Sequence, residues 1–244
     1  MMNKVYLSEA MLSEVFWPRL RNAATALPEA TEITETILSA SRIVHKRFPP
    51  ETAGSIDKDA IRKLWLLARY FRPRVIAEVG TFIGRSTLAL SEGAGDSLQQ
   101  MHTCDYSFAE FGIPEEFNAR FKNAKKIAYH AKTASNQMFK SMLGQHRERV
   151  DFFFLDGRLS VEDIEPVKAL RSKNVVFVID DFEGVEKGVA NAMLLRQAFN
   201  DLVLLRPEAI LEPSTGLRIT NTALMLTADS LSLSRQQEVP LDMC

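Results

Sequence analysis

Short apolar runs alternate with amphipathic stretches along most of this chain. Seven segments of four to six residues predict strands at 75–79, 99–104, 126–130, 150–155, 175–179, 202–205 and 222–227, with 75–79 rich in β-branched residues and 150–155 plainly buried. Between them, apolar residues at helical spacing predict helices directly after the first strand and at 114–123, 135–143, 161–171 and 186–199. Alternating strands and helices indicate an α/β domain with a doubly wound, mostly parallel sheet.

The last predicted strand differs from the others in how it is connected. The 16 residues between 205 and 222 contain Pro207, Pro213 and Gly216 and are too few for another crossover helix. We read this segment as a loop and expect the strand at 222–227 to run antiparallel to its neighbours.

Residues 1–50 have a different pattern. Apolar residues at helical spacing predict helices at 9–24 and 31–46, separated by Pro28. A further helix is expected to begin at Ser55 or Asp57 and to end before Pro73. The chain thus divides into a helical N-terminal extension (1–50), an α/β domain (51–230) and a polar tail (231–244). The apolar faces of the extension need a cover, either the α/β domain or a second copy in a homodimer.

A glycine turn links the first strand to its helix. Gly80 and Gly84 flank this turn, and the helix follows at once. Such a turn directs the free N–H groups at the start of the helix towards an anion above the end of the strand. A dinucleotide fingerprint would need glycine at positions 82 and 85, which hold Phe82 and Arg85. A phosphate-binding P-loop is excluded because 75–91 contain no lysine.

The remaining pattern, Glu78-x-Gly80-x-x-x-Gly84-x-Ser86, resembles motif I of the class I S-adenosylmethionine-dependent methyltransferases, especially the catechol O-methyltransferase-like branch. The resemblance covers roughly residues 55–227 and implies a seven-stranded sheet of order 3-2-1-4-5-7-6. It implies transfer of the methyl group of S-adenosylmethionine to a small-molecule acceptor, with a hydroxyl oxygen favoured and nitrogen or carbon left open. Helices like those of residues 1–50 cap the active site or form a dimer interface in that branch.

The resemblance also assigns cofactor contacts. In a doubly wound sheet the ligand lies at the carboxyl ends of the strands, where Asp105 can accept both ribose hydroxyls. Tyr106 stacks on adenine or is ordinary packing, and Thr133 and Ala134 contact the adenine edge or only cap a helix. The resemblance also implies that Glu78 binds the methionine portion of S-adenosylmethionine. The expected cofactor-binding residues are Glu78, Gly80, Phe82, Gly84, Ser86, Asp105, Tyr106, Thr133, Ala134 and Asp156.

Three acids follow two neighbouring predicted strands. Asp156 ends the fourth strand, and Asp180 and Asp181 end the fifth. Carboxylate oxygens suit Mg²⁺ or another divalent cation, so we expect these three residues to be metal ligands. The alternative is that they are solvated loop acids, or that Asp156 contacts only the cofactor.

The predicted catalytic residues are Asp156, Asp181 and Arg158. Arg158 either orients an acidic substrate or is a surface cation. The catechol enzymes carry a lysine base three residues after the first metal aspartate, where this chain has Leu159, so the general base is left open.

Composition narrows the function further. The 244 residues include 30 basic and 31 acidic ones, for a formal net charge of −1. This balance gives no excess of positive charge that would indicate binding to nucleic acid or to an anionic membrane. No apolar run is long enough to span a bilayer, and the two cysteines favour a reducing compartment, so a cytoplasmic protein is expected.

Two rival functions stay open: an S-adenosylmethionine-binding protein without methyl transfer, and an NAD(P)-dependent oxidoreductase. The identity of the acceptor cannot be read from the sequence.

Overall fold

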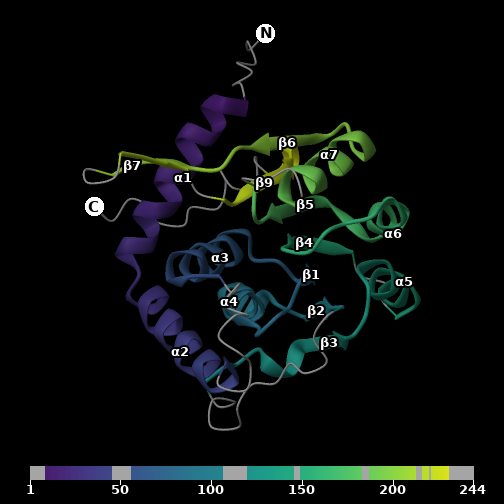
Figure 1. The fold of residues 1–244 in the computed structure, drawn as a ribbon, viewed down its shortest axis with the longest axis horizontal. Coiled ribbons are helices and arrows are strands. Elements are labelled where there is room, and N and C mark those ends of the chain that lie inside the picture. Colours follow the sequence, from purple (N-terminus) through teal and green to yellow (C-terminus); the bar gives the residue numbers. More distant parts are fainter. Residues whose placement is uncertain are drawn as a thin grey trace.

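A computed structural model describes residues 9–45, 56–106, 120–145, 149–182, 187–212, 216–219 and 221–230 (Figure 1). It contains a seven-stranded sheet of order β3-β2-β1-β4-β5-β9-β6. The strands are β1 (Val75–Val79), β2 (Gln100–Asp105), β3 (Ile127–Ala131), β4 (Val150–Leu155), β5 (Arg171–Ile179), β6 (Leu202–Leu205) and β9 (Ala223–Thr227). The order and the mostly parallel pairing confirm the α/β fold expected from the sequence.

The segment between β6 and β9 contains a feature that the sequence did not predict. β9 pairs antiparallel with both β5 and β6, as expected for a connection without a helix. The connection itself includes a two-stranded hairpin, formed by β7 (Ala209–Glu212) and β8 (Gly216–Ile219), so its interpretation as a loop was wrong. A glycine and two prolines obscured the short strands, because these residues are typical of loops.

Helices cover both faces of the sheet. One layer contains α3 (Lys58–Phe71) and α4 (Arg85–Ala94), and the other contains α5 (Ser135–Gln145), α6 (Ile164–Leu170) and α7 (Gly188–Ala198) (Figure 1). The described residues also form the short 3₁₀ helices η2 (Gly95–Ser97), η4 (Ala124–Lys126) and η5 (Val161–Asp163). Asp57 is the N-cap of α3, and its side chain accepts from the N–H of Ala60 at 2.8 Å.

Two predicted helices differ in the structure. The helix expected at 161–171 is split into η5 and α6, and Arg171 already belongs to β5. The helix expected at 114–123 lies mainly outside the described residues.

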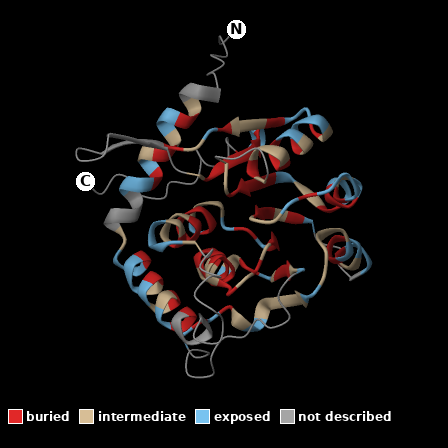
Figure 2. Ribbon diagram, viewed as in Figure 1, coloured by how far each residue is buried: buried red, intermediate tan, exposed pale blue. Residues whose placement is uncertain are grey.

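Each face of the sheet has its own apolar core, drawn in red in Figure 2. Ile76, Leu90 and Phe152 belong to the core beneath α3 and α4. Phe153 and Phe177 belong to the core on the other face, with their rings stacked 4.8 Å apart between centroids. The two cores fix the sheet between its helices, so the carboxyl ends of the strands form a rigid edge.

The two N-terminal helices pack on the α/β domain of the same chain. They are α1 (Glu9–Ala26) and α2 (Pro28–His45), and they lie outside α3 and α4 (Figure 1). Trp17 of α1 and Ile37 of α2 are buried in the same apolar core as Leu67 of α3. The indole N–H of Trp17 donates to the carbonyl oxygen of Arg206 at 2.5 Å. The apolar faces of α1 and α2 are therefore covered by the α/β domain of the same chain, one of the two possibilities that the sequence left open.

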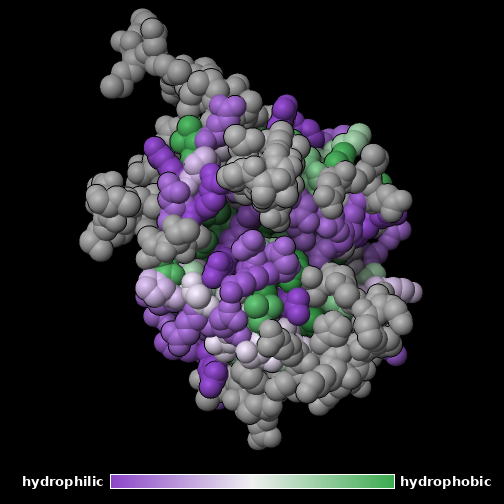
Figure 3. Space-filling model, turned by 60° about the vertical axis from the view of Figure 1, so that its left-hand side comes forward, coloured by the Kyte–Doolittle hydropathy of each residue, from purple (hydrophilic) through white to green (hydrophobic). Residues whose placement is uncertain are grey.

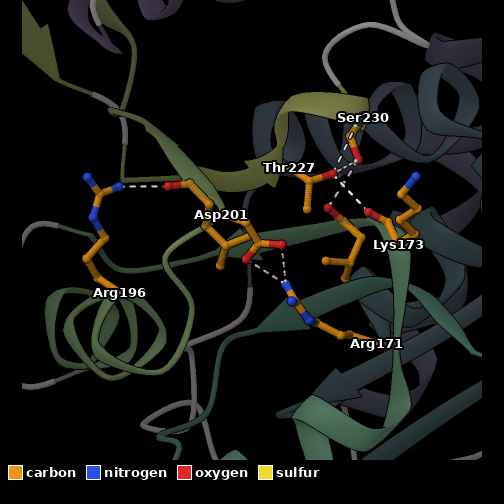
Figure 4. A network of polar contacts seen from close by, with 8 residues as sticks. Arg171, Lys173, Arg196, Asp201, Thr227 and Ser230 are labelled. Atoms are coloured by element: carbon orange, nitrogen blue, oxygen red, sulfur yellow. Dashed lines mark hydrogen bonds and ion pairs between the residues drawn. The ribbon is translucent and has the colours of Figure 1, made fainter.

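A network of polar contacts lies at the amino end of β5. Arg171 donates two hydrogen bonds of 3.0 Å to Asp201, and the hydroxyl of Thr227 donates to the carbonyl oxygen of Lys173 at 3.1 Å (Figure 4). These contacts join β5, β6 and β9 at the edge of the sheet opposite to the candidate site, which indicates a structural role for them.

Figure 3 shows the hydropathy of one face of the molecule. Hydrophilic residues predominate among the coloured residues of Figure 3, and the hydrophobic ones form small groups. Among the described residues, no helix combines the length and the apolar character needed to cross a bilayer.

Candidate cofactor and catalytic site

The register of the strands brings the expected site residues to one edge of the sheet. Val79 is paired with Cys104 on one side and with Leu155 on the other, and Leu155 is paired with Ile179. The strands β1, β2, β4 and β5 therefore end at the same level. The residues near these ends are Gly80, Asp105, Asp156 and Asp180, as the parallel arrangement predicts.

Backbone hydrogen bonds continue from the strands into the loops. Gly80 N–H donates to the carbonyl oxygen of Cys104 at 3.0 Å, and Asp156 N–H donates to that of Val79 at 3.0 Å. Thr133 N–H donates to the carbonyl oxygen of Asp105 at 3.1 Å. These bonds join the starts of the loops after β1, β3 and β4 to the ends of the neighbouring strands β2 and β1.

The glycine turn between β1 and α4 needs its glycines for its backbone conformation. Gly80 has φ of 100° and Gly84 has φ of 78°, which side chains disfavour. A Cβ atom on Gly80 would lie 3.0 Å from the backbone nitrogen of Gly157. The sequence predicted that Gly80 flanks this turn and contacts a cofactor. In the structure it also permits the close approach of the loop after β4.

Glu78, in β1 beside this turn, is a fully buried acid with one oxygen unused. Its Oε2 accepts from the hydroxyl of Thr87 at 2.5 Å, whereas Oε1 has no hydrogen-bond partner among the described residues. Burial raises the pKa of Glu78 to about 7, although the hydroxyls of Ser86, Thr103 and Thr87 offset part of this rise. A buried carboxyl group with an open oxygen can receive a donor or a cation from a ligand.

Asp105 holds the glycine turn from the neighbouring strand. Its Oδ2 accepts from the backbone N–H of Phe82 at 2.8 Å, and Phe82 has a positive φ of 45°. The next residue, Tyr106, is 75% exposed, so its ring is not packed in the core. The carboxylate of Asp105 and the ring of Tyr106 therefore lie at the edge where the sequence predicted ribose and adenine contacts.

The helix after β3 begins with local contacts of its own. The hydroxyl of Thr133 donates to the carbonyl oxygen of Ala131 at 2.8 Å, and Ala134 N–H donates to Oε1 of Gln137 at 3.3 Å. The contact of Gln137 with the N–H of Ala134 is a capping contact at the helix start, whereas the hydroxyl of Thr133 donates to a carbonyl oxygen, which is not a capping contact. The contact of Thr133 and Ala134 with adenine stays a prediction.

A lysine lies between two of the expected metal ligands. Nζ of Lys187 is 2.6 Å from Oδ1 of Asp156 and 2.5 Å from Oδ2 of Asp181. Burial lowers the pKa of Lys187, but hydrogen bonds to both carboxylates outweigh this effect and raise the pKa above its usual value. Burial also raises the pKa of Asp156, against the effect of Lys187. The sequence analysis did not identify Lys187, because its contact with the acids depends on how distant segments pack.

The third acid has different surroundings. Asp180 is buried, and its Oδ1 accepts from the hydroxyl of Thr222 at 3.3 Å. Burial raises its pKa to about 7, and the charges of Asp156 and Asp181 add to this rise. In the part of the chain that the structure describes, no group of three His, Cys, Asp or Glu side chains is arranged to hold a metal ion. The expected set of Asp156, Asp180 and Asp181 is therefore not confirmed as a metal centre.

The loop after β4 points its side chains in opposite directions. Arg158 is exposed, and Leu159 is buried with its N–H donating to Oδ1 of Asn191 at 2.8 Å. Leu159 stands where the resemblance would place a lysine base, and its buried side chain faces the core. Residue 159 therefore supplies no base.

Comparison with known proteins identifies solved structures with the same fold. No protein-family model matches the chain, and no curated protein matches it by sequence. Among solved structures, the chain is similar to the O-methyltransferase TomG from Streptomyces achromogenes, in complex with S-adenosylmethionine and involved in tomaymycin synthesis. The TM-score is 0.57 at 20% identity, over 79% of this chain and 89% of that one.

Two further structures have the same fold. An O-methyltransferase from Bacillus cereus, in complex with S-adenosylhomocysteine, matches with a TM-score of 0.57 at 17% identity, over 80% of this chain and 90% of its own. A methyltransferase from Podospora anserina bound to S-adenosylhomocysteine matches with a TM-score of 0.54 at 17% identity, over 80% of this chain and 88% of its own. The chain therefore has the Rossmann-like fold of the class I methyltransferases.

Proposed function

We propose that this protein is an S-adenosylmethionine-dependent methyltransferase that methylates a hydroxyl oxygen of a small molecule. The single observation that carries this proposal is Glu78, a fully buried acid beside the glycine turn whose Oε1 has no hydrogen-bond partner among the described residues, on a fold found in methyltransferases with bound cofactor. The amino group of the methionine portion of S-adenosylmethionine is a cation and matches the need of that oxygen. A nicotinamide dinucleotide has no ammonium group, and Phe82 occupies the turn where its pyrophosphate would approach.

The residues around the edge fit this cofactor. The turn containing Gly80 and Gly84 precedes α4, whose first N–H groups suit the methionine carboxylate. Asp105 would accept the ribose hydroxyls, and Tyr106 is exposed beside it for stacking on adenine. Ser86 is buried near Glu78, so we assign the carboxylate contact to the backbone of the helix start rather than to its hydroxyl.

The bound cofactor supplies an electrophilic methyl group on a positively charged sulfur. The bond from carbon to sulfur breaks with its electron pair on sulfur, and a lone pair of the acceptor oxygen forms the new bond to carbon. We assign the hydroxyl proton to Asp181, which is the more exposed of the two carboxylates that Lys187 joins, 42% against 21% for Asp156. The fold contributes alignment of the two reactants.

A divalent cation, which the sequence resemblance implied, does not fit the described arrangement. The ammonium group of Lys187 already contacts one carboxylate oxygen of Asp156 and one of Asp181. Asp180 is buried and accepts a hydrogen bond from Thr222. We therefore derive no step through a metal. Arg158, exposed on the loop after β4, is proposed only as a contact for an acidic group of the substrate.

Cofactor binding is expected to release a proton from Glu78 near pH 6. The free protein holds this proton because burial raises the pKa of Glu78 to about 7, and a bound ammonium group favours the carboxylate. The complex thus binds fewer protons than the free protein, so affinity rises as the pH rises towards 7. Calorimetry in two buffers of different ionisation enthalpy measures this release.

Glu78→Gln is the matched variant, since glutamine keeps the shape and an acceptor for Thr87 but carries no titratable proton. It should bind S-adenosylmethionine more weakly and without proton release. Equal proton release in both proteins would remove Glu78 from the cofactor site. Binding without turnover on any hydroxyl-bearing acceptor would favour a binding protein that has no methyl transfer.

A homodimer remains a prediction from the sequence. The apolar residues of the two N-terminal helices that motivated it, such as Trp17 and Ile37, are buried within one chain. Sedimentation at micromolar concentration would decide, and a monomer would remove the prediction.

A further inference from the structure

The loops after β4 and β5 and the start of α7 meet at one lysine. Asp156 follows β4, Asp181 comes two residues after the end of β5, and Lys187 directly precedes α7. Nζ of Lys187 contacts both carboxylates, at 2.6 Å and 2.5 Å. Because the side chain of Lys187 is about one third exposed, the ammonium group lies at the boundary between the protein and the open edge of the sheet.

The position of this lysine is fixed by its neighbours in α7. A Cβ atom on Gly188 would lie 2.5 Å from the carbonyl oxygen of Asp180 and 2.6 Å from that of Asp181, closer than such atoms approach. Only glycine therefore allows α7 to begin directly against the turn after β5. Asn191, one helical turn further, is fully buried and donates to the carbonyl oxygen of Gly157 at 2.9 Å. These contacts join the start of α7 to both loops that carry the acids.

The charges explain what this arrangement does. Two carboxylates at one site repel each other unless a cation lies between them, and Lys187 supplies that cation from the chain itself. A divalent ion bound to the same two oxygens would be repelled by the ammonium group. An ammonium group has three N–H donors, and the two carboxylates use two of them.

We propose that Lys187 is the resident cation of the methyl-transfer site, in place of a divalent metal, and that it positions the acceptor oxygen with its third N–H. This inference rests on the proposed function and deepens it. The ammonium group donates to the acceptor oxygen and favours its loss of a proton to Asp181, and the oxygen then bonds to the methyl carbon as the bond from carbon to sulfur breaks. Lys187 is thus a substrate-positioning residue.

Binding of Mn²⁺ tests this proposal without any substrate. Electron paramagnetic resonance measures free and bound Mn²⁺ in four proteins: the parent, Lys187→Met, Lys187→Arg and Lys168→Met. Lys168 is the matched control, because it is also paired with a carboxylate, Glu165 at 2.7 Å, but lies on the surface of α6. Lys187→Met should bind one Mn²⁺ at least about tenfold more tightly than the other three proteins, since it alone leaves Asp156 and Asp181 free for the ion.

Two results would overturn the proposal. The first is tight binding of Mn²⁺ by the parent protein, with an affinity equal to that of Lys187→Met. Tight binding by the parent would overturn the proposal even if Lys187→Met fails to fold. The other is a folded Lys187→Met protein that binds Mn²⁺ no better than Lys168→Met. Adding Asp156→Asn to Lys187→Met should abolish the new site, and binding that survives this change would place the ion elsewhere.

Methyl transfer from radiolabelled S-adenosylmethionine to a set of phenols and alcohols gives the second measurement. The parent should keep full activity after exhaustive chelation, and Lys187→Met should lose about 100-fold in kcat with unchanged cofactor affinity. Parent activity that requires added Mg²⁺ would contradict the proposal. A parent that binds no S-adenosylmethionine would instead refute the proposed function and leave the Mn²⁺ result intact.

Discussion

Replacing Trp17 by alanine is expected to lower the free energy of unfolding by about 3 to 5 kcal/mol, the usual cost of removing a large buried aromatic side chain. Trp17 is 2% exposed in the core shared by α1 and α3, and its indole N–H donates to the carbonyl oxygen of Arg206. The loss would be a large fraction of the stability of a domain of this kind. Urea denaturation of the parent and the variant measures it.

Val15→Ala is the matched control, because Val15 lies on the same helix but is 47% exposed. Its effect should stay within about 0.5 kcal/mol, as for most surface substitutions. A cost below about 1 kcal/mol for Trp17→Ala would mean that α1 does not pack in solution as the structure has it.

Asp105→Ala is expected to weaken binding of S-adenosylmethionine by about 1.5 to 3 kcal/mol, or roughly 10- to 150-fold, as for loss of a hydrogen bond to a charged group. The carboxylate would bind the ribose and also accepts from the N–H of Phe82 at 2.8 Å. The variant thus loses a ligand contact and a support of the glycine turn. Calorimetry on protein shown to be folded gives the difference.

A similar contact away from the site separates these effects from a general loss of stability. Asp151 accepts from the backbone N–H of Arg74 at 3.0 Å, at the opposite ends of β1 and β4. Asp151→Ala should leave cofactor affinity unchanged. If Asp105→Ala binds the cofactor as tightly as the parent does, Asp105 is not a ribose ligand.

The positions of the strands could be predicted because their signals are local, whereas the order of the sheet was implied by the resemblance to the methyltransferases. The predicted bounds of 150–155 and 202–205 coincide with β4 and β6, since each strand is an apolar run with clear ends. The glycine turn and the acids at the strand ends were also accessible, because parallel strands bring their carboxyl ends together whatever the sequence between them. These signals position Gly80, Asp105, Asp156 and Asp180 without any tertiary contact.

The partners of these residues could not be predicted, because they depend on how distant segments pack. Lys187 is 31 residues from Asp156, and no spacing rule relates a lysine at a helix start to an acid after another strand. The same applies to Thr222, which directly precedes β9. It contacts Asp180, although the two residues are 42 positions apart in the sequence. Three acids without their partners suggested a metal, whereas the packed chain supplies an ammonium group.

The contacts of α1 with the end of β6 bear on whether another molecule could pair with this outer strand of the sheet. β6 is the outermost strand on its side of the sheet, and Arg206 follows it directly. The N–H of Arg206 donates to the hydroxyl of Ser13 at 2.9 Å, and its carbonyl oxygen accepts from Trp17. Backbone groups at the edge of a sheet are a template for a strand from another molecule. By occupying both groups, α1 protects this end of the edge, and a chain that loses α1 gains a site for self-association in addition to its loss of stability.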